Sequence, residues 1–177
     1  MKKPTVSMLV TAVVVVIAFL LPSLGVRNYY LHIAILSLLN ALLAMGVNFI
    51  AGYAGQLSLA QAAFFGIGSY AASLAVLNLH VSFWLALLIG VLASIMVAVG
   101  FGLPTLRLKG PYFVISTLGF GEIVRLVFLN WETVTRGPNG LAIEGPAPLS
   151  LGFAVWELDT KAGFYYLTLL ALVIALF

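Results

Sequence analysis

The residues best suited to chemistry in this chain are an acid and a base three positions apart in an apolar stretch. Glu122 and Arg125 fall at i and i+3 of a helix predicted over Tyr112 to Leu129, so their side chains can pair on one face. Glu122 lies about 15 Å along this helix, near the middle of a bilayer. Three interpretations follow: a structural ion pair, part of the electrostatics of a substrate path, or a proton relay. The guanidinium argues against the relay, because a carboxylate held in an ion pair does not readily shuttle protons.

A second polar group lies in a stretch that otherwise carries no charge. No Lys, Arg, Asp or Glu occurs between Asn28 and Leu106, yet this stretch contains G-Y-A-G-Q-L-S-L-A-Q-A-A-F-F-G-I-G-S-Y from Gly52 to Tyr70. Glycines and small residues permit close packing of membrane helices. Packing alone does not require glutamine or serine, so these residues either line or gate a path through a broken helix or lie at the cytoplasmic interface.

Two glycines in Thr117-Leu118-Gly119-Phe120-Gly121 precede the charged pair and indicate close backbone approach or a kink. Together with the charged pair and the polar residues of the Gly52 to Tyr70 block, these residues form one set of candidates for lining a transport path. The candidate path-lining residues are Gln56, Ser58, Gln61, Thr117, Gly119, Glu122 and Arg125.

Several kinds of chemistry are not expected from this sequence. It has no cysteine, which excludes disulfides, thiolate metal sites and cysteine nucleophiles. It has no Walker A motif, nucleophile elbow or H-E-x-x-H. Its net charge of +3 is spread thinly, without the basic patch that nucleic-acid binding needs. We therefore expect neither an enzyme nor a cofactor, a metal or a nucleic-acid partner.

The elements that hold these residues are predicted to be membrane spans. The chain is 63% hydrophobic and 7% charged, far below the charge that a soluble domain carries. The sequence predicts an all-α, polytopic transmembrane helix bundle in the lipid bilayer, with about five full spans and the start of a sixth. These are Thr5 to Leu24, Leu31 to Ile50, Leu57 to Leu77, Phe83 to Leu103, Tyr112 to Leu129 and, incomplete, Phe164 to Phe177. For the first, a signal peptide is the alternative.

The cations predict the orientation. With the N-terminus in the cytoplasm, the short basic turn at Arg107 and Lys109 lies inside together with Lys2 and Lys3, as the positive-inside rule demands. Between Glu132 and Lys161 the chain is then an outer, loop-like segment. Because the chain stops inside an apolar run, we expect residues 1–177 to be one transmembrane domain that is incomplete at its C-terminus.

The outer segment holds a cluster of turn-forming residues after Thr135. It is either an ordinary surface loop or a face on which an external partner docks. The candidate docking residues are Arg136, Gly137, Pro138, Asn139 and Gly140.

Three motifs in this order resemble a known family. They are the Gly52 to Tyr70 block, L-R-L-K-G-P-Y-F-V-I-S-T-L-G-F-G-E-I-V-R and T-R-G-P-N-G-L. Together they resemble the permease subunits of branched-chain amino-acid ABC transporters, most closely the LivM type. The resemblance implies an inner-membrane subunit that pairs with a second permease subunit. It also implies two cytoplasmic ATP-binding subunits and a periplasmic binding protein for leucine, isoleucine or valine.

The chain departs from that family at two positions: Gln61 stands where many members have His, and Arg136 stands where Gly is common. Two other functions stay open beside the importer. One is an ion-coupled secondary transporter whose broken segment near Gly52 binds the substrate. The other is a non-transporting membrane scaffold packed through its small residues.

Overall fold

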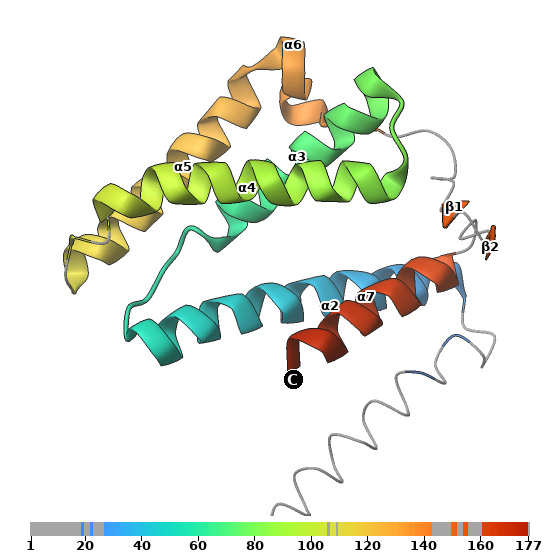
Figure 1. Cartoon of the computed structure of the whole chain (residues 1–177), viewed down its shortest axis with the longest axis horizontal. Coiled ribbons are helices and arrows are strands. Elements are labelled where there is room, and N and C mark those ends of the chain that lie inside the picture. The colour runs from blue at the N-terminus through green and yellow to red at the C-terminus, as the bar shows by residue number, and fades with distance from the viewer. Residues whose placement is uncertain are drawn as a thin grey trace, which may run out of the picture. The chain divides into compact units, whose positions relative to one another are not determined.

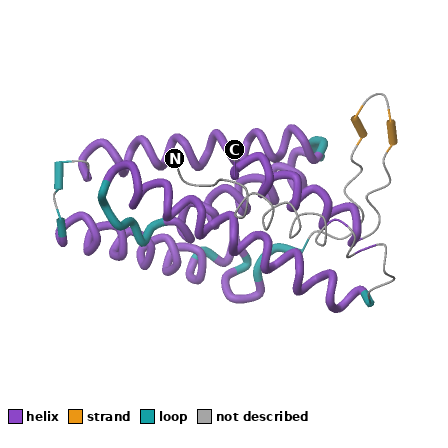
Figure 2. Tube along the Cα trace, turned by 90° about the horizontal axis from the view of Figure 1, so that it is seen from below, coloured by secondary structure: helices purple, strands orange, loops and turns teal. Residues whose placement is uncertain are grey.

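The computed structural model describes residues 19, 22, 27–105, 107–108, 110–142, 150–151, 154–155 and 161–176. Helices make up nearly all of this part of the chain (Figure 2), which confirms the all-α membrane bundle. One antiparallel hairpin joins β1 (Ser150–Leu151) to β2 (Ala154–Val155) in the predicted loop-like segment. The first predicted span, Thr5 to Leu24, lies outside the described residues apart from Phe19 and Pro22.

Four helices in the described part of the chain are long and apolar enough to cross a membrane. They agree with the predicted second to fifth spans (Figure 1). They are α2 (Asn28–Phe49) with the π-helix η2 (Ile50–Ala54), α3 (Gln61–Leu79), α4 (Phe83–Thr105) and α5 (Pro111–Asn130). The shorter apolar helix α7 (Lys161–Leu176) lies where the sixth span is predicted to begin.

The helix ends follow from local residue chemistry. Gly55 ends the π-helix with φ +63°, a conformation that glycine adopts without steric penalty. Pro111 opens α5, where its missing N–H is not needed. Pro104 lies inside the last turn of α4, which ends at Thr105, two residues beyond the predicted span. The Thr105 hydroxyl donates to the carbonyls of Phe101 and Gly102 at 2.8 and 3.1 Å.

The predicted start of the third span at Leu57 is wrong. Residues 55–60 are not helical, and α3 begins at Gln61. Two backbone N–H groups of this segment bond to side chains instead of to a preceding helical turn. Leu59 N–H donates to Thr117 Oγ1 at 3.1 Å and Ala60 N–H donates to Ser58 Oγ at 3.4 Å. Such side-chain acceptors compete with helix formation.

The chain divides into two compact units, and the first takes in Met1–Leu42 and Glu157–Phe177. Its core is formed where α2 meets α7: Leu31, Tyr165 and Leu169 are buried against one another. Tyr166 also donates a hydrogen bond to the carbonyl of Phe19 at 3.3 Å. That residues 1–177 form a single permease domain stays a prediction.

The second unit, Leu43–Trp156, contains α3, α4 and α5, with α3 packed against both of the others. The α3 and α4 backbones meet at glycines. A Cβ added to Gly90 would lie 2.5 Å from the carbonyl oxygen of Gly68 and 3.2 Å from Ala72 Cβ. A Cβ at Gly66 would come within 2.9 Å of the Phe128 ring on α5. Close helix packing through Gly66 and Gly68 is therefore confirmed.

Candidate functional site

On one face of α5, Phe113 and Thr117 are buried. We call this face the closed face. Thr117 is 1% exposed. Its hydroxyl accepts the hydrogen bond from Leu59 N–H and donates to the Val114 carbonyl at 2.9 Å. Thr117 thus fixes the non-helical segment before α3 against α5, and both of its hydrogen bonds stay within the protein.

Ser58 belongs to the same arrangement. Its side chain is buried and accepts the hydrogen bond from Ala60 N–H. Ala60 itself is fully buried. Ser58 and Thr117, two of the seven predicted path-lining residues, are therefore both buried, and each accepts a hydrogen bond from a backbone N–H of the same non-helical segment.

The two glutamines lie at either end of this segment and are half-buried. The Gln61 side-chain amide occupies the space that a Cβ at Gly46 would need, so a glycine on α2 makes room for it. Around Gly52 and Gly55, by contrast, no described atom lies within 4 Å of an added Cβ. Within the described residues these two glycines therefore make no close helix contact, and Gly55 serves the turn.

The opposite side of α5 is open and carries the charges. This open face comprises Ile115, Leu118, Glu122 and Arg125, at spacings of three and four residues. Arg125 Nη2 and Nε donate to the two Glu122 oxygens at 2.6 and 2.9 Å, a bidentate geometry that charge-assisted pairs favour. The predicted pairing is confirmed. The side chains are nevertheless 59% and 50% exposed, so nothing described covers the pair.

Gly119 lies at the edge of the open face, one turn before Glu122. No described atom approaches within 4 Å of a Cβ built there. It therefore does not serve helix packing within the described residues. The structure separates the predicted residues of α5 into two sets: Thr117 on the closed face, and Gly119 with the charged pair on or beside the open one.

The turn after α5 is rigidly bonded. The chain passes from α6 (Glu132–Thr135) into the 3-10 helix η3 (Gly137–Asn139). Thr135 is buried and its hydroxyl donates to the Phe128 and Trp131 carbonyls at 2.6 and 2.8 Å. Arg136 between these helices has φ +59°. The predicted turn at Arg136, Gly137, Pro138, Asn139 and Gly140 is thus an ordered structure.

Gly137 is required in this turn. It is buried at φ +57°, and a Cβ there would lie 2.9 Å from the Leu129 carbonyl oxygen. Arg136 has no such restriction on its side chain, which is exposed. In the described residues no carboxylate forms an ion pair with it.

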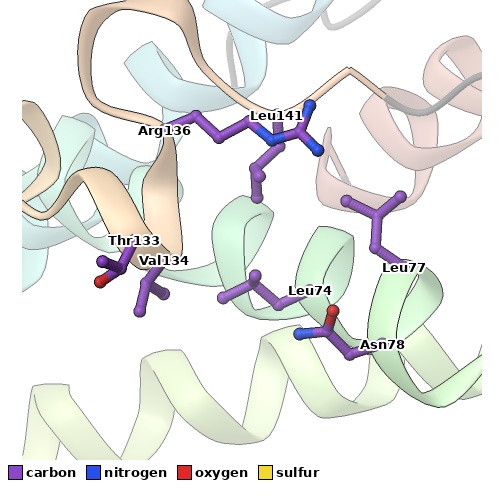
Figure 3. Close-up of a pocket in the computed structure, with 7 residues that line it drawn as sticks. All are labelled: Leu74, Leu77, Asn78, Thr133, Val134, Arg136 and Leu141. Carbon is purple, nitrogen blue, oxygen red and sulfur yellow. The ribbon is translucent and has the colours of Figure 1, made fainter.

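A hollow of about 370 Å³ lies between the end of α3 and this turn (Figure 3). The side chain of Arg136 extends across it toward the end of α3. Its lining residues are Leu74, Leu77, Asn78, Thr133, Val134, Arg136 and Leu141. Within the described ranges, no three His, Cys, Asp or Glu side chains gather where they could hold a metal ion.

Sequence reasoning did not find this hollow. Its walls come from the last turns of α3 and from α6, which are distant in sequence, and most of the lining residues are leucines and valines that look like ordinary membrane residues. It also missed Gly46 as the partner of Gln61. The only available signal for the hollow was an arginine among turn-forming residues.

The fold, with a charged pair on one of its span-length helices, defines a polytopic helical membrane protein, the class to which transport proteins belong. Residues 29–177 match the family described as the permease component of the branched-chain amino acid transport system. The chain belongs to this family, and the resemblance predicted from three motifs is confirmed. It is a multi-pass membrane protein.

Two curated relatives carry the name high-affinity branched-chain amino acid transport system permease protein LivM. The chain is 42% identical to the one from Escherichia coli (strain K12) over 125 residues and 39% identical to the one from Salmonella typhimurium (strain LT2) over 122 residues. Each match covers 68% of this chain but 28% of the relative, so the chain corresponds to only part of these proteins. No solved structure matches it.

Proposed function

We propose that this chain is a membrane-spanning permease subunit of an ATP-driven importer that moves branched-chain or related amino acids across the inner membrane. The observation that carries this proposal is the family match, which extends over all four span-length helices. Both curated relatives are named as permeases for branched-chain amino acids. Transport subunits carry the path, and ATP hydrolysis belongs to separate chains in this proposal, in keeping with the missing Walker A motif.

The proposed partners are a second permease subunit, cytoplasmic ATP-binding subunits and a periplasmic amino-acid-binding protein. The N-terminus is proposed to lie in the cytoplasm, which places the turn at Arg136 to Gly140 outside. An ordered turn suits docking, because little conformational entropy remains to be lost when a partner binds. The hydrogen bonds of Thr135 supply that order.

Within the subunit, we assign the path to the open face of α5. A charged pair that is half-exposed at the middle of a span is costly against hydrocarbon, so it faces protein or water in the assembled transporter. Gly119, Glu122 and Arg125 then line the path, with Gln56 and Gln61 at the ends of the broken segment. Ser58 and Thr117 support the path from behind by holding that segment.

The energy source tests the proposal. Membrane vesicles that contain the complete transporter and its binding protein are loaded with ATP and given labelled leucine. We expect uptake that continues when an uncoupler collapses the ion gradients and stops when ATP is omitted. The reverse result identifies an ion-coupled secondary transporter. If the intact chain is present in the membrane but the vesicles take up no leucine under either condition, the result favours a non-transporting scaffold.

A further inference from the structure

The hollow beside Arg136 combines three chemical features in one small space. One is a guanidinium, the second is a group of aliphatic side chains, and the third is the C-terminal end of a long helix (Figure 3). Its volume of about 370 Å³ is at the lower end of the range for ligand sites, which suits a small molecule.

The backbone of Arg136 is held in place by hydrogen bonds, and its side chain is exposed. No described carboxylate pairs with Arg136, while its backbone N–H donates to the Glu132 carbonyl and its own carbonyl accepts from Asn139 N–H. Its φ of +59° costs a non-glycine residue about 1 kcal/mol. The turn therefore keeps an arginine at a position where the backbone would favour glycine.

The opposite wall carries negative character. Leu77 and Asn78 belong to the last turn of α3, which ends at Leu79 with His80 as its cap. The last carbonyl groups of a helix lack partners within the helix and form the negative end of its dipole. Asn78 adds a side-chain carbonyl that can accept a hydrogen bond.

Aliphatic side chains fill the remaining walls: Leu74, Leu77, Val134 and Leu141. They offer dispersion contacts to a branched alkyl group and no hydrogen-bond partners. The three features thus match the three parts of a zwitterion with an aliphatic side chain.

We propose that this hollow binds a free aliphatic α-amino acid at the outer face. Arg136 pairs with its carboxylate, the end of α3 with Asn78 receives its ammonium group, and the leucines hold its side chain. This assignment rests on the proposed function and gives the substrate a first contact on the permease after it leaves the binding protein. Arg136 is then a ligand-binding residue and not only part of a docking surface.

Calorimetric titration of the purified, complete transporter without its binding protein tests the site. L-leucine should bind the wild type, and L-leucinol, which lacks the carboxylate, should bind at least about tenfold more weakly because one charge-assisted pair is lost. Arg136→Gln should weaken leucine binding by a similar factor, and Arg136→Lys should weaken it less. Arg107→Gln removes an exposed charge in a turn far along the chain and serves as the matched control, with affinity unchanged.

A second variant approaches the site from another helix. Leu77→Trp fills the hollow from α3 and leaves the residues of the turn unchanged. It should abolish leucine binding while the transporter stays assembled. The proposal is overturned if the wild type binds no leucine, if leucinol binds as well as leucine, or if both variants retain wild-type affinity. It is overturned too if Arg136→Gln keeps wild-type leucine affinity and, in a separate titration with the periplasmic binding protein, weakens only the binding of that protein.

The same preparations separate this inference from the proposed function. ATP-driven leucine uptake by the wild type is measured in parallel. If the wild type shows ATP-driven uptake but both variants keep wild-type leucine affinity, the proposed binding site is wrong and the proposed importer function is still supported. No uptake by the wild type removes the importer, whatever the titration shows.

Discussion

The two faces of α5 satisfy their polar groups in different ways. On the closed face, Thr117 is buried and makes both of its hydrogen bonds within the protein. On the open face, Glu122 and Arg125 satisfy each other and leave half of their surface uncovered. A buried hydroxyl with all its hydrogen bonds made stabilises the fold. An uncovered charge pair on a membrane span must instead contact water or another protein surface in the assembled transporter. Polarity alone does not distinguish these roles; burial does.

Leaving one charge unpaired on the open face should have the greatest effect on transport. Arg125→Leu should reduce leucine uptake by the complete transporter to background, because the unpaired Glu122 carboxylate is then costly at this depth. Uptake and the amount of protein in the membrane are measured together. The exchanged pair, Glu122→Arg with Arg125→Glu, is the matched control for pairing.

We expect the exchanged pair to restore the amount of protein in the membrane but not uptake, since a path is sensitive to where each charge lies. Full recovery of uptake would show that the charges only stabilise the helix. The open face would then lose its role in the path.

Thiol labelling can measure how accessible the open face is to water, because the sequence contains no cysteine. Leu118→Cys on the open face and Met96→Cys on α4 replace residues that are 56% and 70% exposed. A charged, water-soluble thiol reagent reacts with thiolates in water but not with thiols in lipid. We expect rapid labelling at residue 118 and labelling slower by about tenfold or more at residue 96, measured by mass shift in intact vesicles. Equal rates would contradict a watery open face.

The smallest expected effect lies on the closed face. Thr117→Val keeps the shape but leaves Leu59 N–H without its acceptor, a loss worth about 1–3 kcal/mol for a buried donor. The thermal unfolding midpoint of the detergent-purified transporter should fall, while the substrate concentration for half-maximal uptake stays the same. Thr117→Ser retains the acceptor and should recover most of the stability. A changed half-maximal concentration with unchanged stability would place Thr117 in the path.

The sequence was sufficient to predict the spans but not the faces. Apolar length alone located α2 to α5, and helical spacing alone paired Glu122 with Arg125. The start of α3 was misplaced because Leu57 to Ala60 looks apolar, and the acceptor that keeps Leu59 out of a helix is 58 positions away. The same limit applies to Thr117, whose partner is not local. Contacts between residues far apart in the sequence determine which side chains of a helix are buried, and these contacts cannot be read from a single sequence.

The glycine contact between α3 and α4 restricts how this part of the protein can move. With Gly90 against the Gly68 carbonyl, the register of the two helices is locked. If α3 slid by one turn, Phe64 or Ala72 would take the place of Gly68, and neither leaves the same room for the α4 backbone. The two helices are therefore expected to move together as one rigid unit. Any rearrangement of α3 during a transport cycle must carry α4 with it.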